Sequence, residues 1–299
     1  MKTTPTEATK NPYILMPILL LMWGSFAAVN KLLLRHLDSY QVLFYTYGIA
    51  AVSFSILFIV WWKRKPKTIW TGKSVILLMC CGVFTFLYDI LYVKALEMLP
   101  AVEASMLNYL FPIFIVLFAV PMNHEKLNKY KVISIILGFA GTLLLVTKGD
   151  LASLHLTNLL GDLMAIAAAV CWGLYTNLLK KNTLDLFHST LIITITASLL
   201  STIGMALNSR FTVPSLPDFS YLAWISLSTH VVGFFLYYRA LQYASASLVA
   251  SFTYFTPFIT LGLIVLMLGE KLTPVDLTAF ALICLGMVYS RKVKATATG

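Results

Sequence analysis

Two ionisable residues stand inside otherwise apolar stretches of this sequence. Asp89 lies within FTFLYDILYV at 84–93, and His230 lies within LSTHVVGFF at 227–235. An ionisable group in such a setting is costly unless it is paired or faces water, so it is a candidate functional residue. Asp89 is suited to binding the amino group of a solute or, in competition with it, a proton. A packing role is the alternative for Asp89, and a packed neutral ring is the alternative for His230.

Both residues fall on helical faces that also carry small, polar and aromatic side chains. Positions i, i+3, i+4 and i+7 of a helix share one face. Four such faces occur: Thr85, Tyr88, Asp89 and Tyr92; Ser105, Asn108, Tyr109 and Pro112; His230, Gly233, Phe234 and Tyr237; Ala250, Thr253, Tyr254 and Pro257. A lipid-facing stripe would instead consist of Leu, Ile, Val and Phe, so these faces predict the lining of a central cavity. The predicted solute-binding residues are Tyr88, Asp89, Asn108, Tyr109, Tyr175, His230, Thr253 and Tyr254.

Some of these residues have a simpler explanation that the sequence leaves open. Tyr92 and Tyr237 lie near predicted helix ends, where tyrosines often anchor a helix in the membrane interface. Asn108 and Thr253 are also suited to hydrogen bonds that hold neighbouring membrane helices together.

The composition indicates a membrane protein. Hydrophobic residues make up 59% of the 299 residues and charged residues 11%, against about 45–50% and about 25% in soluble domains. About 20 apolar residues cross a bilayer as a helix, whereas the strands of a membrane barrel would alternate in polarity, which these runs do not. We predict an all-α membrane protein with ten transmembrane helices, at 13–35, 40–62, 74–96, 101–121, 131–148, 158–179, 187–208, 219–241, 247–268 and 274–290.

The first of these segments resembles a secretory signal, because SFA at 25–27 is a passable cleavage site. However, the dipeptide WG at 23–24 recurs at 172–173 in similarly helical sequence, so we assign the first segment to the membrane core. All four cysteines fall inside apolar segments and have no partner at a metal-like spacing. Neither a metal nor a cofactor is expected.

The net charge of +10 indicates orientation rather than an acidic partner. Lys and Arg gather near the termini and in alternate loops, as in KRKPK at 63–67 and RKVK at 291–294. Such an excess marks the cytoplasmic side of a membrane protein. Both termini and the loop at 63–73 are therefore predicted to be cytoplasmic, and the loops at 148–158 and 208–218 to face outward. No nucleic acid partner is expected.

The chain contains one sequence pattern twice. SMLNYLFPIFIVLFAVPMNHEKL at 105–127 and ASFTYFTPFITLGLIVLMLGEKL at 250–272 align with a spacing of 145 residues. Pro112 and Pro257 pair in this alignment and are predicted hinges, although membrane helices also tolerate proline as a simple kink. Each half contains five predicted helices, and an odd number inverts the second half relative to the first. Inverted repeats are typical of transporters whose substrate site lies near the bilayer midplane. The predicted domains are the two five-helix repeats, at 13–148 and 158–290.

The proline and the Glu-Lys-Leu of each fourth helix, in a five-plus-five inverted arrangement, resemble the drug/metabolite transporter superfamily in its EamA-domain branch. Within that branch, EASMLNYLFP at 103–112, SFTYFTP at 251–257 and YDI at 88–90 are similar to the bacterial YddG-type aromatic amino acid exporters. The resemblance covers essentially the whole chain after residue 10 and implies export of small organic solutes across a bacterial inner membrane. Glu125 and Glu270 are part of this repeated signature and are expected to cap the helix that follows each.

The aromatic faces suit a solute with an apolar or aromatic body, held by stacking and by hydrogen bonds from Asn108 and His230. We therefore expect amino acids, aromatic ones first, as substrates. Exporters of other metabolites share much of the pattern, and the energy source, uniport or exchange for protons, stays open.

A membrane-embedded enzyme and a channel are the competing functions. The sequence contains neither H-E-x-x-H nor G-x-S-x-G. Asp89, Asp150 and Asp162 are too scattered to form a paired-aspartate site. No continuous ring of charge indicates an ion filter, so we expect a transporter and not an enzyme.

Overall fold

The computed structural model describes residues 11–60, 71–150, 158–256, 258–259 and 273–295, and every regular element in these ranges is a helix. The α-helices are α1 Pro12–Trp23, α2 Phe26–Leu33, α3 Ser39–Val60, α4 Gly72–Met98, α5 Ala101–Asn108, α6 Phe111–Asn123, α7 Lys129–Thr147, α8 Leu159–Lys180, α9 Leu186–Asn208, α10 Leu216–Ile225, α11 Phe234–Tyr243, α12 Ala246–Thr253 and α14 Pro274–Ala295. A π-helix, Ser226–Gly233, joins α10 to α11. The all-helical prediction is confirmed for the described residues.

Seven helical segments in the described ranges are long and apolar enough to cross a membrane. They are Pro12–Leu33, Ser39–Val60, Gly72–Met98, Glu103–Asn123, Leu159–Lys180, Leu186–Asn208 and Leu216–Tyr243. Apolar side chains on their outer faces, such as Ile59 and Leu207, are 73% and 78% exposed and are suited to contact with lipid tails. The chain is therefore a multi-pass helical membrane protein.

The other three predicted membrane segments are helical where the structure describes them. The segments 131–148 and 274–290 correspond to α7 and α14. The segment 247–268 begins with α12, and most of the remainder lies outside the described residues.

Side-chain caps determine where the central helices begin. The hydroxyl of Thr71 accepts the Ser74 N–H at 3.2 Å at the start of α4, and Asn158 accepts the Gly161 N–H at 3.1 Å at the start of α8. Such caps satisfy N–H groups that have no partner in the first turn of a helix. They fix the register of the helices that carry Tyr88 and Asp89 on α4, and Trp172 and Tyr175 on α8.

Three predicted membrane segments are interrupted helices in the structure. Pro112 cannot donate to the carbonyl of Asn108 and its ring crowds that carbonyl, which separates α5 from α6. Gly24, a poor helix former, lies at the break between α1 and α2. The third interruption is the π-helix. The segments concerned are 101–121, 13–35 and 219–241.

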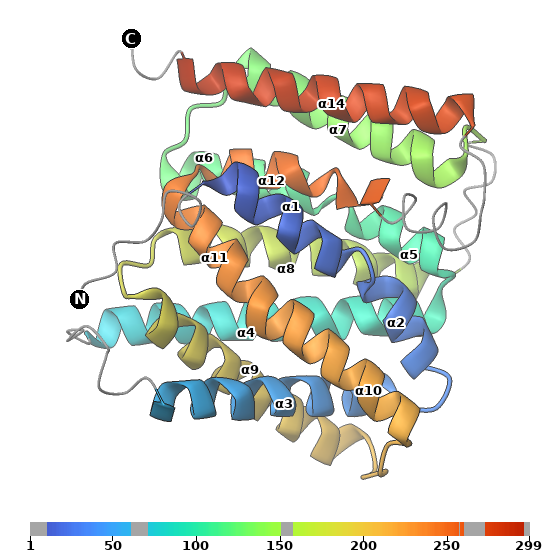
Figure 1. The fold of residues 1–299 in the computed structure, drawn as a ribbon, viewed down its shortest axis with the longest axis vertical. Coiled ribbons are helices and arrows are strands. Elements are labelled where there is room, and N and C mark those ends of the chain that lie inside the picture. Colours follow the sequence, from blue (N-terminus) through green and yellow to red (C-terminus); the bar gives the residue numbers. More distant parts are fainter. Residues whose placement is uncertain (1–10, 61–70, 151–157, 257, 260–272, 296–299) are drawn as a thin grey trace.

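Figure 1 shows α7 and α14 side by side along the upper edge of the molecule, and α3 beside α9 along the lower edge, with α4, α8 and α11 between them. The connectors α2–α3, α4–α5 and α9–α10 lie at the right-hand end in this view. The connectors α6–α7, α8–α9 and α11–α12 lie at the left-hand end. Successive segments therefore run back and forth between two ends, as membrane helices do.

Glycines allow two central helix pairs to approach closely. A Cβ atom on Gly173 of α8 would lie 2.8 Å from Phe114 Cβ of α6, and one on Gly82 of α4 would lie 2.8 Å from the Ile193 carbonyl oxygen of α9. Small residues at such crossings increase van der Waals contact, which is a main source of stability between membrane helices.

Candidate functional site

Five aromatic side chains from α1, α4, α8 and α11 meet at the centre of the bundle, and we call them the aromatic cluster. The rings of Trp23 and Trp172 lie 5.4 Å apart, edge to face. Tyr237 lies 5.3 Å from each of them. Tyr88 and Tyr175 lie 4.6 Å and 5.0 Å from Trp172. Both halves of the chain contribute, so the cluster is a contact between them.

Polar atoms without partners border the aromatic cluster. Asn108 Nδ2 donates to the hydroxyl of Tyr88 at 3.2 Å, but Asn108 Oδ1 has no hydrogen-bond partner among the described residues. The indole N–H of Trp23 likewise has none in the described part of the chain. Buried polar groups are normally satisfied, so these two atoms are available to bind a solute.

Asp89, Tyr47 and His230 form a second group, which we call the polar cluster. The Tyr47 hydroxyl donates to Asp89 Oδ2. His230 Nδ1 lies 3.8 Å from the same oxygen, and the Tyr47 and His230 rings are 4.5 Å apart. Asp89 and His230 are each only 2% exposed. The cluster therefore holds two ionisable side chains away from water.

The π-helix brings His230 to Asp89. A π-helix inserts an extra residue into a helical turn, and such insertions are frequent at functional sites. Gly233 ends this segment, and a Cβ atom there would lie 2.9 Å from Trp23 Nε1 and 2.8 Å from the Ser228 carbonyl oxygen. A larger residue would force α1 away from the π-helix.

The two clusters are neighbours. The ring of Phe234 lies 5.2 Å from His230, 6.2 Å from Tyr175 and 6.4 Å from Trp172. Within the described ranges, no group of three or more His, Cys, Asp or Glu side chains is arranged to hold a metal ion. The chemistry available here is hydrogen bonding, aromatic stacking and proton exchange.

Two of the other predicted site residues, Thr253 and Tyr254, make their contacts outside both clusters. The Thr253 hydroxyl donates to the Ala250 carbonyl of its own helix at 2.6 Å. Tyr254 packs its ring against α7, where a Cβ atom on Gly138 would lie 2.4 Å from it. Tyr109 is half-buried at the break between α5 and α6, close enough to Tyr88 of the aromatic cluster to interact with it electrostatically. Pro257 lies outside the described residues.

Sequence reasoning missed three members of the two clusters, Trp23, Trp172 and Tyr47. The recurring WG dipeptide is the sequence signal for the two tryptophans, because the predicted inverted repeat would bring repeat-related residues together at its axis. Tyr92 and Tyr237 are 5% and 0% exposed, so the interfacial-anchor alternative is wrong for both. No sequence signal distinguishes Tyr47 from the other tyrosines.

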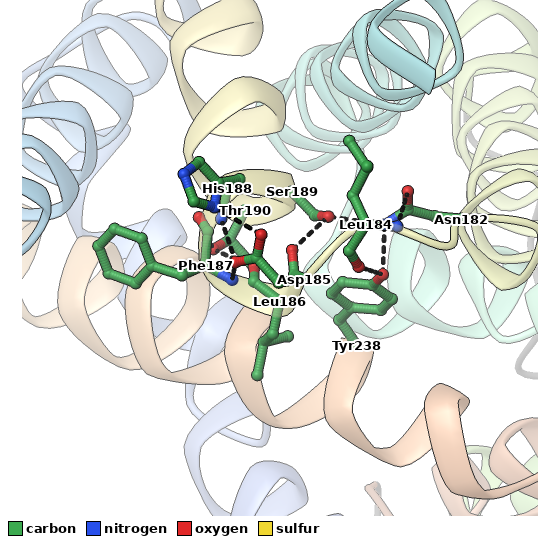
Figure 2. A network of polar contacts seen from close by, with 9 residues as sticks. All are labelled: Asn182, Leu184, Asp185, Leu186, Phe187, His188, Ser189, Thr190 and Tyr238. Atoms are coloured by element: carbon green, nitrogen blue, oxygen red, sulfur yellow. Dashed lines mark hydrogen bonds and ion pairs between the residues drawn. The ribbon is translucent and has the colours of Figure 1, made fainter. Parts of the chain in front are cut away.

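Figure 2 shows how the connector between α8 and α9 is fixed to α11. The hydroxyl of Tyr238 donates to the Leu184 carbonyl at 3.0 Å and accepts a hydrogen bond from Asn182. Asp185 caps α9, and its second oxygen lies 2.5 Å from His188 Nδ1. Because α8 and α11 carry rings of the aromatic cluster, this network helps to set their spacing.

Glu125 joins two segments that are far apart in the sequence. Its carboxylate accepts the Ala246 N–H at 2.9 Å and the Ser247 hydroxyl at 2.5 Å, and it pairs with Lys131 at 2.9 Å. Burial alone would raise the pKa of Glu125, but the hydrogen bonds from Lys131 and Ser247, the Lys131 charge and the Ala246 N–H hold this pKa below its usual value. The expectation that Glu125 caps the following helix was wrong, because it caps α12. Glu270 lies outside the described residues.

Apolar helices that cross a bilayer, packed around buried aromatic and ionisable side chains, define a membrane protein of the transporter class. The EamA-like transporter family matches residues 11–147 and 159–291 of the chain. The chain belongs to this family, and its resemblance to drug/metabolite transporters is confirmed.

Several relatives are described as transporters. A protein described as an uncharacterized transporter of Archaeoglobus fulgidus is 32% identical over 272 residues, covering 87% of this chain and 90% of that protein. The aromatic amino acid exporter YddG of Ancylobacter novellus is 31% identical over 114 residues, covering 38% of this chain and 37% of that protein. A crystal structure shares the fold with a TM-score of 0.79 at 19% identity, covering 99% of this chain and 100% of that one.

Proposed function

We propose that this protein is a secondary transporter that exports small organic solutes, amino acids and aromatic ones first, by alternating access. Its solute site would lie between two inverted five-helix repeats at 13–148 and 158–290. The observation that carries the proposal is the aromatic cluster. Both halves of a chain that belongs to a transporter family contribute rings to it, and two polar atoms beside these rings have no hydrogen-bond partner among the described residues.

Equivalent contacts at opposite ends of the molecule support the inverted repeat of ten helices. The Lys31 ammonium donates to the Leu99 carbonyl at 2.7 Å, where α4 ends. The Lys180 ammonium donates to the Ala244 carbonyl at 2.5 Å, just beyond the end of α11. Lys31 and Lys180 are 149 residues apart, and Leu99 and Ala244 are 145 apart, which are the spacings of the repeat. An inverted repeat requires such pairs at opposite ends.

Aromatic pairs in and beside the aromatic cluster support the same symmetry. Trp23 and Trp172 are repeat-related and touch each other, as two residues at the axis would. Phe26 stacks on Tyr92 at 5.9 Å and 8°, and the repeat-related pair Tyr175 and Tyr237 stacks at 6.4 Å and 15°.

A solute with an aromatic or apolar body suits this cluster. Aromatic rings stack at the spacings seen between these side chains, and a few placed polar groups orient a ligand in an otherwise apolar site. The Trp23 N–H would donate to a carboxylate and Asn108 Oδ1 would accept from an amino group. The named substrate class of the YddG relative agrees with this chemistry, although that match covers 38% of the chain.

Asp89 and His230 would serve the polar end of the solute, with Asp89 binding the amino group and His230 orienting it. Tyr88 and Tyr175 would stack on its body. Tyr109, Thr253 and Tyr254 are the other proposed solute-binding residues. They would contact the solute in another conformation of the transporter. Pro112 and Pro257 would act as hinges, and the helix break beside Pro112 supports this role for the first of them.

Transport of another small metabolite or drug-like compound is the second candidate, in either direction. The Archaeoglobus relative, which matches over most of its length, has no named substrate. A membrane-embedded enzyme is the third and least favoured candidate.

We place the protein in a bacterial inner membrane with both termini cytoplasmic, on the basis of the basic segments KRKPK and RKVK.

A growth-protection assay tests the substrate class. Cells that express the protein should tolerate toxic analogues of aromatic amino acids better than cells that express the Trp172→Ala variant. Protection against an unrelated class of metabolite alone would show that the amino acid assignment is wrong.

A further inference from the structure

The polar cluster lacks a permanent positive charge. Tyr47 is 0% exposed and Asp89 and His230 are each 2% exposed. Tyr47 is the hydrogen-bond donor to Asp89, and no Lys or Arg in the described part of the chain pairs with it. His230 Nδ1 has no hydrogen-bond partner among the described residues. Nothing in the cluster therefore neutralises a carboxylate except a proton.

The groups around Asp89 are otherwise neutral. On its own helix Tyr88 is close enough to interact with it electrostatically, as is Tyr175 of the packed helix α8. Tyr47 faces it from α3 and His230 from the π-helix. An isolated buried carboxylate is costly, and proteins avoid the cost by protonating it or pairing it. The cluster can therefore accept a proton, carried by Asp89 or shared with His230.

The polar cluster also breaks the symmetry of the repeat. Asp89 pairs with Phe234 in the repeat alignment, and His230 pairs with Thr85, so the related position cannot titrate. Tyr47 and Asp89 belong to the first half and His230 to the second. A change of charge here alters one contact between the halves and leaves its symmetry mate unchanged. It would thus favour one of two otherwise similar conformations.

We infer that Tyr47, Asp89 and His230 form a proton-binding site and that solute export is coupled to proton entry through it. The inference rests on the proposed transport function. The Asp89 carboxylate takes one proton from outside water when the site opens outward. It gives up that proton on the cytoplasmic side, where the amino group of the solute takes its place, and the solute then leaves outward.

The proton site is tested without any solute by infrared difference spectroscopy on the full chain in lipid nanodiscs, between about pH 5 and about pH 8. Wild type should show the carbonyl band of a protonated carboxyl group that disappears at the higher pH. Asp89→Asn should lose this band. Asp162→Asn, a matched change of a buried acid at the start of α8 (3% exposed), should keep it. Identical difference spectra for wild type and a folded Asp89→Asn protein would overturn the inference. If Asp89→Asn does not fold, Tyr47→Phe should shift the band, and an unshifted band would count against the site.

Coupling is tested in proteoliposomes that contain a pH-sensitive dye. A phenylalanine gradient should drive protons in the opposite direction in wild type. Asp89→Asn should move no protons and should exchange phenylalanine more slowly, because the carboxylate that binds the amino group is also lost. Phenylalanine transport without proton movement in wild type, or transport that depends on sodium and not on pH, would overturn the coupling. If Asp89→Asn loses phenylalanine but not 3-phenylpropionate exchange and wild type moves no protons, Asp89 is an amine ligand only and the coupling is overturned. Failure to move any aromatic solute would contradict the proposed function instead, and the infrared result would still decide the proton site.

Discussion

The residues of the two clusters have different proposed roles in solute binding and proton binding. The aromatic cluster offers flat apolar surface, and the polar cluster beside it offers charge that can change. Phe234 touches both, at 5.2 Å from His230 and 6.4 Å from Trp172. A solute bound in the aromatic cluster would therefore be near enough to exchange its amino group for the proton on Asp89.

Replacement of Trp172 by Ala should weaken solute binding and destabilise the fold together. Trp172 is 3% exposed and lies 5.4 Å or less from each of the four other rings of the aromatic cluster. Removing a buried ring of this size costs about 3–5 kcal/mol. Thermal unfolding in detergent and the solute concentration at half-maximal exchange measure the two effects.

Trp224→Ala is the matched control, because Trp224 is 49% exposed. It should leave solute affinity unchanged. Equal effects of the two substitutions on affinity would show that the central position of Trp172 has no special importance.

At the scale of elements, lysine side chains from neighbouring helices donate hydrogen bonds to the carbonyl groups at helix ends. Carbonyls at the end of a helix have no partner within it, and Lys31 and Lys180 satisfy such groups at repeat-related places. Lys180 also donates to the Leu241 carbonyl at 2.5 Å. These contacts fix α2 to α4 and α8 to α11.

Lys180→Met should lower the free energy of unfolding by about 1.5–3 kcal/mol, the range for hydrogen bonds to a charged group. Lys31→Met should cost less, because Lys31 satisfies one carbonyl and Lys180 satisfies two. Lys181→Met changes an exposed neighbour and should have little effect. Thermal unfolding of the purified variants compares the three, and a Lys181 effect as large as that of Lys180 would refute the capping role.

Stability should fall in acid through Glu125. The pKa of Glu125 is lower in the folded protein than its usual value of 4.5. The charged form therefore stabilises the fold at pH values above about 4.5, and this stabilisation is lost as the pH falls through the folded-state pKa.

Glu125→Gln should be less stable than wild type at neutral pH and should approach it at low pH. Unfolding curves measured between about pH 3 and about pH 7 test this prediction. A difference that stays constant across this range would mean that the Glu125 charge does not contribute.

The sequence predicted the helices better than their interruptions. Apolar length predicts that a segment crosses the membrane, and helical faces predict Tyr88 and Asn108 as lining residues. The contact of Tyr47 with Asp89 depends on how α3 packs against α4, and the place of the π-helix depends on how it packs against α3. Such packing follows from the shapes of many side chains at once, so it has no local sequence signature.

At the scale of the whole molecule, the basic loops predict the direction in which the chain crosses the membrane. Connectors alternate between two ends of the bundle in Figure 1. The basic segments at 63–67 and 291–294 predict which end is cytoplasmic.

A cysteine introduced at position 65 should react with an impermeant thiol reagent only after the cells are opened. Cysteines placed within 148–158 or 208–218 should react in intact cells. The native cysteines are first removed, because Cys80 is exposed. Labelling of position 65 in intact cells would contradict the inverted-repeat account.

The central claim is that the two halves of the chain form a carrier for amino acids. Counterflow in proteoliposomes tests this claim most directly. Vesicles loaded with unlabelled phenylalanine should accumulate external radiolabelled Phe or Trp transiently, because a carrier exchanges solute across the membrane. Trp172→Ala vesicles should do so far more slowly. Failure of Phe, Trp and Thr to exchange, while another metabolite class exchanges, would contradict the amino acid assignment and leave only the family membership standing.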